Sequence, residues 1–294
     1  YKSNTGAYAW TATSGPKVCE TFPGPYKIPK YACEHAAYYT NTCGRGAYRG
    51  PWMFETVSRE SFMDVAAKKL GVDAVELRRR NVIHADDQPY KSVGGVTYDA
   101  VSPDQTLEVA ARAVDIPAFR AEQEAARRQG RYLGLGLSLY MEPTAAPLIF
   151  MSHYYCQVRV EVSGDVTVVS HAHSQGQGTE TTLAQIVAQE LGVPYERVRV
   201  LQGDSNQGGF GMGSGGSRQG VMAGGAAIVA AQRMRAKILK IAAHLMEAAE
   251  GDLDIMDGVV HVAGVPDMSI SIDKIAQTAY FTAAQLPPGM EPGL

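Results

Sequence analysis

The chain has 294 residues, of which 45% are hydrophobic and 19% are charged, and its formal net charge is −3 at pH 7. A chain of this length can bury a large core and can hold two domains. The slight acidic excess, without any cluster of Lys and Arg, argues against a nucleic-acid partner or an anionic membrane surface. The longest apolar stretch, around residues 224–231, is too short for a membrane span, and residues 1–30 lack a secretory signal pattern. We therefore expect a cytoplasmic protein.

The first 130 residues mix extended and helical patterns. Apolar residues at helical spacing predict a helix over residues 54–70, which Gly71 ends. Asp73 is expected to cap a second helix within DAVELRRRN, with Glu76 as its capping-box partner. We also expect strands over residues 1–13 and 31–40, a proline-rich loop over 21–31, a loop or short hairpin over 90–99, and helices over 102–114 and 117–129.

The second half of the chain is more regular. Residues 131–141 alternate in a way that predicts a strand, and we expect a domain boundary near Gly130. A hairpin is expected around the turn at residues 163–165. The remaining expected elements are helices over residues 181–191, 217–249 and 270–280, a strand over 195–203 and a hairpin over 251–262. Irregular alternation of helices and strands indicates the α+β or mixed α/β class.

The chain has four cysteines, at positions 19, 33, 43 and 156. Cys33, His35 and Cys43, with Cys19 as a fourth ligand, can be considered as a metal cluster. Their spacing matches no zinc module, so we expect no metal there. Reduced, mostly buried thiols are the favoured interpretation.

A glycine-rich loop, HSQGQGTETT, covers residues 173–182 and leads into an expected helix. Gly176 and Gly178 would let a ligand approach the backbone closely, and Gln177 offers both a donor and an acceptor. Thr179, Thr181 and Thr182 lie at the helix start, where free amides and the helix dipole favour an anion. A plain helix N-cap with a flexible entry loop explains the pattern equally well.

A second glycine-rich loop, GGFGMGSGGSRQG, covers residues 208–220 and has seven glycines in thirteen residues. Ser217 and Arg218 lie at a helix start, so amides, a hydroxyl and a guanidinium could form a phosphate cradle. The loop is not a Walker P-loop, because the G-K-[ST] ending is missing. A long surface loop is the alternative.

Two further groups are less specific. Arg49, within GAYRGPW, could point into a pocket or form a surface salt bridge. His171 and His173 lie on the same face of an expected strand, but no third ligand follows by spacing. We therefore favour structural or hydrogen-bonding roles for the two histidines over a metal pair.

Long collinear motifs in this sequence resemble a known enzyme family. GQGTETTLAQIVAQELGVPYERVRVLQGDS, FGMGSGGSRQG and NTCGRGAYRGPW…ESFMDVAAKKLGVDAVELRRRNVI resemble the molybdopterin-binding large subunit of the xanthine dehydrogenase/aldehyde oxidase family. The resemblance runs over nearly the whole chain. It implies two molybdenum-cofactor-binding domains, each with a mixed sheet and packed helices, of which residues 1–130 would be the latter part of the first and residues 131–294 the first part of the second.

The resemblance also implies a cofactor and partners. The cofactor would be molybdenum held by molybdopterin, as the cytosine dinucleotide in bacterial members. Such enzymes oxidise a C–H bond of an aldehyde or N-heteroaromatic ring with water-derived oxygen. The implied partners are the remaining part of the large subunit, a subunit with two-iron two-sulfur clusters and a flavin (FAD) subunit, in a higher oligomer.

Residue by residue, the resemblance places three groups at the site. Gly176, Gln177 and Gly178 would contact the pyranopterin, and Thr179, Glu180, Thr181 and Thr182 the adjoining phosphates. Gly216, Ser217 and Arg218 would help to hold the dinucleotide. Arg49, with Tyr48, Gly50, Pro51 and Trp52, would line the substrate pocket.

The departures from the family pattern limit what the chain is expected to do. The family's G-x-G-E motif, whose glutamate is the general base, is absent, and neither Glu142 nor Glu180 is assigned that role. The family's GGGFGGK loop is also absent, so we expect the central piece of a longer subunit, inactive by itself. Gly50 stands where the carbon-monoxide-oxidising branch has a cysteine, and Pro51 where xanthine-type enzymes have a phenylalanine. A non-catalytic cofactor-binding or assembly module is the alternative function.

Overall fold

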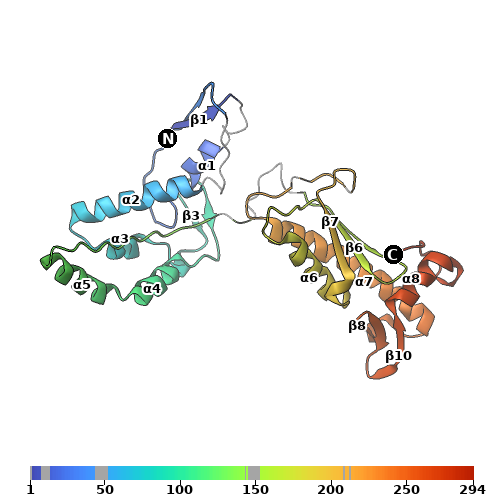
Figure 1. Cartoon of the computed structure of the whole chain (residues 1–294). Helices are drawn as coiled ribbons and strands as arrows, with labels where there is room; N and C mark the ends of the chain where they lie inside the picture. The colour runs from blue at the N-terminus through green and yellow to red at the C-terminus, as the bar shows by residue number, and fades with distance from the viewer. Residues whose placement is uncertain are drawn as a thin grey trace. The chain divides into compact units, whose positions relative to one another are not determined.

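The protein is described from a computed structural model covering residues 2–7, 14–43, 52–142, 144, 153–207, 209–211 and 213–294. The chain forms two compact units, Tyr1–Glu142 and Pro143–Leu294 (Figure 1). Both units combine helices with small sheets, so the expected α+β, mixed α/β class is confirmed. Residues 131–142 belong to the first unit. The assignment of residues 1–130 and 131–294 to two domains of the family stays a prediction.

The first unit is mainly helical. Two parallel strands pair Lys2 with Ala36, and a short antiparallel hairpin pairs Tyr90 with Tyr98, as expected for residues 90–99. The helix Ser14–Thr21 was not expected from the sequence. The helices are α1 (Ser14–Thr21), α2 (Trp52–Leu70), α3 (Ala74–Asn81), α4 (Pro103–Val114) and α5 (Ile116–Arg128), and the strands are β1 (Lys2–Gly6), β2 (Ala36–Tyr39), β3 (Tyr90–Lys91) and β4 (Thr97–Tyr98).

The observed caps of the helices in this unit agree in part with those expected from the sequence. Gly71 has a φ of +66°, which ends α2 as expected. Asp73 caps α3, because its carboxylate accepts hydrogen bonds from the amides of Val75 and Glu76. The expectation for Glu76 was wrong: its side chain accepts from Arg79 and Arg80 instead.

Helix α2 is oriented with polar residues inward. Phe54 and Phe62, which belong to the apolar spacing that predicts the helix, are 54% and 65% exposed. The opposite face is buried and carries Glu55, Thr56, Arg59 and Glu60. The spacing therefore predicted the helix correctly but does not mark the face that is buried in this unit.

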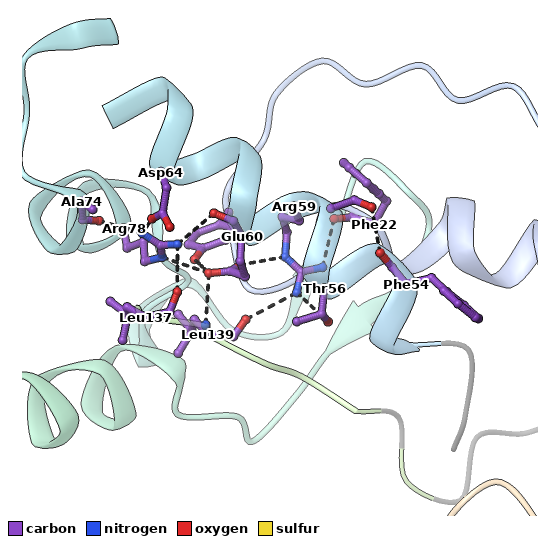
Figure 2. Close-up of polar contacts among 12 residues, drawn as sticks. Phe22, Phe54, Thr56, Arg59, Glu60, Asp64, Ala74, Arg78, Leu137 and Leu139 are labelled. Carbon is purple, nitrogen blue, oxygen red and sulfur yellow. Dashed lines mark hydrogen bonds and ion pairs between the residues drawn. The ribbon is translucent and has the colours of Figure 1, made fainter. Parts of the chain in front are cut away.

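Arg59 and Glu60, on the buried face of α2, belong to a network of charged groups (Figure 2). The carboxylate of Glu60 accepts from Nε of Arg78 at 2.9 Å, from the Tyr26 hydroxyl at 3.0 Å and from Nε of Arg59 at 3.1 Å. Arg78 is fully buried and also donates to Asp64 at 2.8 Å. Burial first, and then the nearby Glu60 carboxylate, raise the pKa of Tyr26, so its phenol stays protonated.

Residues 131–141 do not form the expected strand; within the described chain they are extended without a strand partner. Their backbone is bound by side chains of the network instead. The amide of Leu139 donates to Glu60 at 3.1 Å, and the carbonyl of Leu137 accepts from Arg78 at 3.2 Å (Figure 2). These bonds satisfy backbone groups that a sheet would otherwise pair, and they tie this segment to the first unit.

The second unit is built on a three-stranded sheet with order β5-β6-β7 (Figure 1). β5 and β6 form the expected antiparallel hairpin, with Cys156 opposite Ser170. β7 runs parallel to β6, with Ser170 beside Gln202, so α6 is the crossover of a βαβ unit. The elements are β5 (Cys156–Val160), β6 (Val166–Ser170), α6 (Thr179–Leu191), β7 (Val198–Gln202), a π-helical turn (Gln219–Ala223) and α7 (Gly224–Met246).

A second sheet and a helix complete this unit. The expected hairpin is present as β8 and β9, and a third strand, β10, which was not expected, pairs with β9. Helix α8 follows directly. These elements are β8 (Leu253–Met256), β9 (Val259–Val262), β10 (Val265–Ser271) and α8 (Ile272–Phe281). One apolar core joins both sheets with α6, α7 and α8, and includes Val166, Leu183, Ile238, Val260 and Ile275.

Candidate functional site

The first glycine-rich loop connects β6 to α6 inside the βαβ unit. Gly176 and Gly178 have φ values of +103° and +79°, which glycine adopts readily and other residues rarely do. Gly178 is the N-cap of α6, and no side chain caps the helix at that position. A Cβ at either glycine would meet nothing within 4 Å. The backbone of the loop is therefore open to a ligand.

The threonines at the start of α6 behave differently from one another. Thr182 donates from its hydroxyl to the carbonyl of Gly178 at 3.1 Å, inside the first turn. Thr179 is 6% exposed, and its hydroxyl oxygen has no hydrogen-bond partner among the described residues. A buried hydroxyl without a partner costs free energy, so Thr179 marks a position where an additional partner would be stabilising. Glu180 accepts a hydrogen bond from Gln202 at 2.6 Å, at the end of β7.

The second glycine-rich loop leads into the π-helical turn and α7. Gly213, Gly216 and Ser217 all have positive φ, at +63°, +69° and +52°. The buried guanidinium of Arg218 lies over the ring of Tyr154, 5.3 Å from its centroid. Burial raises the pKa of the Tyr154 phenol, whereas the nearby Arg218 lowers it; the net shift is upward.

The two loops lie against each other. A Cβ on Gly211 would come within 2.5 Å of the His171 side chain, so only glycine fits there. The hydroxyl of Ser214 donates to the carbonyl of His173. Gly213 would also place a Cβ 3.3 Å from the His173 ring. His171, just before the first loop, and His173, at its start, therefore pack against the second loop, which agrees with the structural roles expected for them.

The helices that follow the two loops run in the same direction. Gly224, at the start of α7, lies beside Ile186 of α6. Further along, Gln232 of α7 donates to Glu190, near the end of α6, at 3.1 Å. The amino-terminal ends of both helices consequently lie at the same end of the unit, together with both loops. The free amides and the dipole of the α6 start favour an anion at that end. The amide of Gly224, at the start of α7, already donates to the carbonyls of Gln219 and Val221 in the π-helical turn.

A cavity of about 480 Å³ lies beside the loops, between the end of the sheet and the second glycine-rich loop. Tyr155 packs edge-on against the His171 ring, with 5.6 Å between ring centroids. The Nε2 atom of His171 is buried and has no hydrogen-bond partner among the described residues. The lining residues are Ser170, His171, Gly203, Asp204, Ser205, Gly209, Phe210, Gly211 and Gly213.

These features fit a large polar ligand with anionic groups. In the part of the chain that the structure describes, four buried polar side-chain atoms around the loops and the adjoining strand and helix ends lack a partner: Thr179 Oγ1, His171 Nε2, Gln202 Oε1 and Gln219 Oε1. Gly176, Gly178 and Gly216 leave open space where a side chain would stand. A molybdopterin group, with its phosphates and polar pterin edge, fits such a donor-rich, glycine-lined surface.

The expected substrate-pocket residues are not placed by the structure. Tyr48, Arg49, Gly50 and Pro51 lie outside the described residues, and Trp52 begins α2 with its side chain outside the description. The four cysteines are free, but Cys33 and Cys43 are exposed, so the expectation of mostly buried thiols was wrong. Within the described ranges, no three His, Cys, Asp or Glu side chains are grouped to hold a metal ion.

Sequence reasoning missed Tyr154, Gln202 and Asp204. None of them belongs to a glycine-rich loop, and each reaches the site only through tertiary structure. The phenol of Tyr154 donates to the carbonyl of Gly213 at 2.9 Å, and Asp204 lines the cavity. The signal for Asp204 was its place just after a predicted strand that follows a glycine-rich turn and a helix.

Comparison with known proteins decides the family. Residues 1–82 and 109–291 match two family models, each described as a molybdopterin cofactor-binding domain. The chain belongs to the family of molybdopterin cofactor-binding domains found in the large subunits of molybdenum hydroxylases. It is 38% identical to the nicotine 6-hydroxylase large subunit of Paenarthrobacter nicotinovorans, over 92% of this chain and 34% of that protein. It is 37% identical to the carbon monoxide dehydrogenase large chain of Hydrogenophaga pseudoflava, over 92% of this chain and 35% of that protein.

Solved structures of the family have the same fold. The chain matches quinoline 2-oxidoreductase from Pseudomonas putida 86 with a TM-score of 0.86 and 38% identity, covering 100% of this chain and 39% of that one. The chain thus spans about a third of the length of the two relatives named above. Among the residues described, no helix is both long and apolar enough to cross a membrane.

Proposed function

We propose that this chain is the cofactor-binding part of the large subunit of a molybdenum hydroxylase. The proposed reaction is oxidation of a C–H bond of an aldehyde or N-heteroaromatic ring with water-derived oxygen. The observation that carries the proposal is the meeting of two glycine-rich loops at the amino-terminal ends of α6 and α7. Nicotine 6-hydroxylase and quinoline 2-oxidoreductase, by their names, act on N-heteroaromatic compounds, which favours that substrate class.

The proposed roles of the chain's residues follow from their positions. Gly176, Gln177 and Gly178 form the open backbone that contacts the pyranopterin. The helix start at Thr179, Glu180, Thr181 and Thr182 faces the phosphates with its amides and the unpartnered Thr179 hydroxyl. Gly216, Ser217 and Arg218 hold the other side of the dinucleotide, with Arg218 supplying positive charge. When bound, the cofactor supplies the two-electron oxidation, and the protein supplies preorganised donors.

The finer assignments are also part of the proposal. The cofactor is the cytosine dinucleotide form, and carbon monoxide dehydrogenases among the relatives and solved structures support a bacterial-type subunit. The partners are the remaining part of the large subunit and subunits with iron–sulfur clusters and FAD, in a higher oligomer in the cytoplasm. The family's G-x-G-E glutamate would be supplied by a segment beyond these 294 residues. Tyr48, Arg49, Gly50, Pro51 and Trp52 would line the substrate pocket.

A non-catalytic cofactor-binding or assembly module remains the second candidate, because G-x-G-E is absent from the 294 residues. A measurement of catalytic turnover distinguishes a molybdenum hydroxylase from a non-catalytic module. The complex should be purified from its native host and assayed with aldehydes and N-heteroaromatic compounds and an artificial electron acceptor. The hydroxylase proposal requires oxidation of at least one compound by the complex and none by the isolated 294-residue chain. A molybdenum-containing complex without turnover of any compound would favour the non-catalytic module.

A further inference from the structure

A second cavity, of about 360 Å³, lies in the first unit, between α1, the segment around Tyr31 and the first turn of α2. Its volume falls within the range of about 300–1,000 Å³ that is typical of small-molecule sites. The described residues that line it all belong to the stretch from Val18 to Ser58, within the first unit. The glycine-rich loops belong to the second unit, so the proposed cofactor site does not account for this cavity.

Three aromatic side chains line the cavity. Phe22, directly after α1, and Tyr31 are stacked on each other, with 5.8 Å between the ring centroids and 11° between the ring planes. Phe54, in the first turn of α2, is the third aromatic residue of the lining. The face of an aromatic ring is electrostatically negative and attracts organic cations. These rings therefore favour a ligand that is partly apolar and carries a positive charge.

The charged residues of the lining are both acidic, Glu34 and Glu55. Glu55 is only 1% exposed, and its Oε2 atom is buried and has no hydrogen-bond partner among the described residues. A buried carboxylate oxygen without a donor costs free energy. A ligand that donates a hydrogen bond to Oε2 would remove that cost.

The surroundings of Glu55 do not compensate its charge fully. Burial raises the pKa of its carboxyl, and this effect outweighs the lowering by its own amide, by Arg59 and by the Thr21 hydroxyl. Arg59 is a nearby cation, but its guanidinium pairs with Glu60 at 3.1 Å and donates to the carbonyl of Phe22 at 3.2 Å (Figure 2). A further cation beside Glu55 would consequently stabilise the ionised carboxylate.

Hydrogen bonds hold the aromatic residues in place. The phenol of Tyr31 donates to the carbonyl of Cys19 at 2.9 Å, which ties the segment around Tyr31 to α1. The hydroxyl of Ser58 donates to the carbonyl of Phe54 at 2.9 Å, inside the first turns of α2. Groups that are already ordered lose less conformational entropy when a ligand binds. The cavity is therefore formed before any ligand is present.

We propose that this cavity binds a small organic ammonium ion, with an N–H group of the ligand donating to Oε2 of Glu55. The apolar part of the ligand lies against the three aromatic rings. An ammonium ion meets both demands of the cavity, because it brings positive charge to the rings and a charged donor to the carboxylate. The inference goes beyond the proposed hydroxylase function, since it requires neither the cofactor nor turnover.

The test titrates the 294-residue chain with three probes that share a benzyl group, followed by ligand-observed NMR at pH 7. Benzylamine is a cation with N–H donors, benzyltrimethylammonium is a cation without them, and benzyl alcohol is neutral. A hydrogen bond between charged groups corresponds to about tenfold to hundredfold in affinity. Benzylamine should bind that much more tightly than benzyl alcohol, with benzyltrimethylammonium between them. This comparison needs no substitution, so folding of a variant does not affect it.

Two variants locate the effect. Glu55→Gln keeps the shape of the side chain and removes its charge, so it should weaken benzylamine binding about tenfold or more. Its affinity for benzyl alcohol should stay within about twofold, which also shows that the cavity is intact. Glu20→Gln is the matched control, because Glu20 lies on α1, pairs with Lys17 and does not line the cavity. This variant should leave all three affinities within about twofold.

Three results would overturn the proposal. They are equal affinity for benzylamine and benzyl alcohol, no binding of benzylamine at concentrations up to about 10 mM, and unchanged benzylamine binding in Glu55→Gln. Benzyltrimethylammonium that binds as tightly as benzylamine would overturn the hydrogen bond to Oε2. None of these results bears on the hydroxylase function, which the turnover measurement tests separately.

Discussion

The guanidinium of Arg218 lies over the ring of Tyr154, 5.3 Å from the ring centroid, and the phenol of the same tyrosine donates to the carbonyl of Gly213 at 2.9 Å. One side chain thus holds both the charged residue and the backbone of the second glycine-rich loop. Tyr154 is therefore a positioning residue for the cofactor site, although it lies outside both loops.

Substitution of Tyr154 tests this role. Tyr154→Leu removes the ring and the phenol, and a cation–π contact of this kind corresponds to about twofold to thirtyfold in affinity. We expect that loss in the affinity of the chain for cytidine diphosphate, together with a lower molybdenum content. Tyr154→Phe keeps the ring, so its affinity for cytidine diphosphate should fall only a fewfold. Equal affinity of the leucine and phenylalanine variants would contradict the role of the ring.

Gly178 provides a test of the open backbone in the first loop. Its φ is +79°, and Gly264, in the turn between β9 and β10, has a φ of +78°; a Cβ at either position would meet nothing within 4 Å. Alanine at each should cost a similar ~1 kcal/mol of stability, through backbone strain alone. Only Gly178→Ala is expected to lower the molybdenum content, because its methyl group would occupy the ligand's space. The same molybdenum content in both variants would show that no ligand approaches Gly178.

The buried charges of the first unit predict a large loss of stability when the Glu60 carboxylate is removed. Glu60→Ala leaves the guanidinium groups of Arg59 and Arg78 buried without their shared carboxylate. We expect a loss of about 3–5 kcal/mol in the free energy of unfolding. Glu124→Ala, which breaks the exposed pair with Arg128, should change it by less than about 1 kcal/mol.

Urea denaturation, monitored by tryptophan fluorescence, measures the free energy of unfolding of both variants. The two tryptophans of the chain, at positions 10 and 52, lie within the sequence range of the first unit. A loss for Glu60→Ala no larger than that for Glu124→Ala would show that the network contributes little to stability.

Asp73 predicts a pH dependence for the same unit. Burial by itself raises the pKa of Asp73, but the amides of Val75 and Glu76 and the Arg120 guanidinium outweigh it and leave the pKa below its usual value. A depressed pKa contributes stability that is fully present above the unfolded value of about 3.9 and is lost as the pH falls through the folded value.

Asp73→Asn tests the sign of this dependence. Asparagine still caps α3, so the variant loses mainly the exposed pair with Arg120, which corresponds to less than about 1 kcal/mol. The wild type should be the more stable protein at pH 6, and the difference should shrink toward pH 3. A difference that grows as the pH falls would contradict the lowered pKa of Asp73.

The sequence predicted local elements well where a pattern and its cap agree. Helix α2 with Gly71, the hairpin of β5 and β6, and α6 after its glycine turn are examples. It did not predict which face of α2 is buried, because Arg59 and Glu60 are satisfied by Arg78, and those contacts join distant parts of the chain. For the same reason residues 131–141 were interpreted as a strand, whereas side chains from α2 and α3 bind their backbone.

The candidate site was predicted in part. Both glycine-rich loops carry a local signal, since positive φ and helix starts depend on the residues present. Their packing against each other requires His171 next to Gly211, a contact that no local pattern encodes. Tyr154 and Asp204 were missed because single residues outside a motif gain their roles only from the arrangement of β5, β7 and the second loop.

The central claim is that the two loops bind a molybdenum cofactor in its dinucleotide form. The most direct test is to purify the protein with its partners from the native host and measure molybdenum and acid-released nucleotide per chain. We expect about one molybdenum and one CMP per chain, with both reduced in Gly178→Ala. A native complex that contains neither molybdenum nor CMP would contradict it.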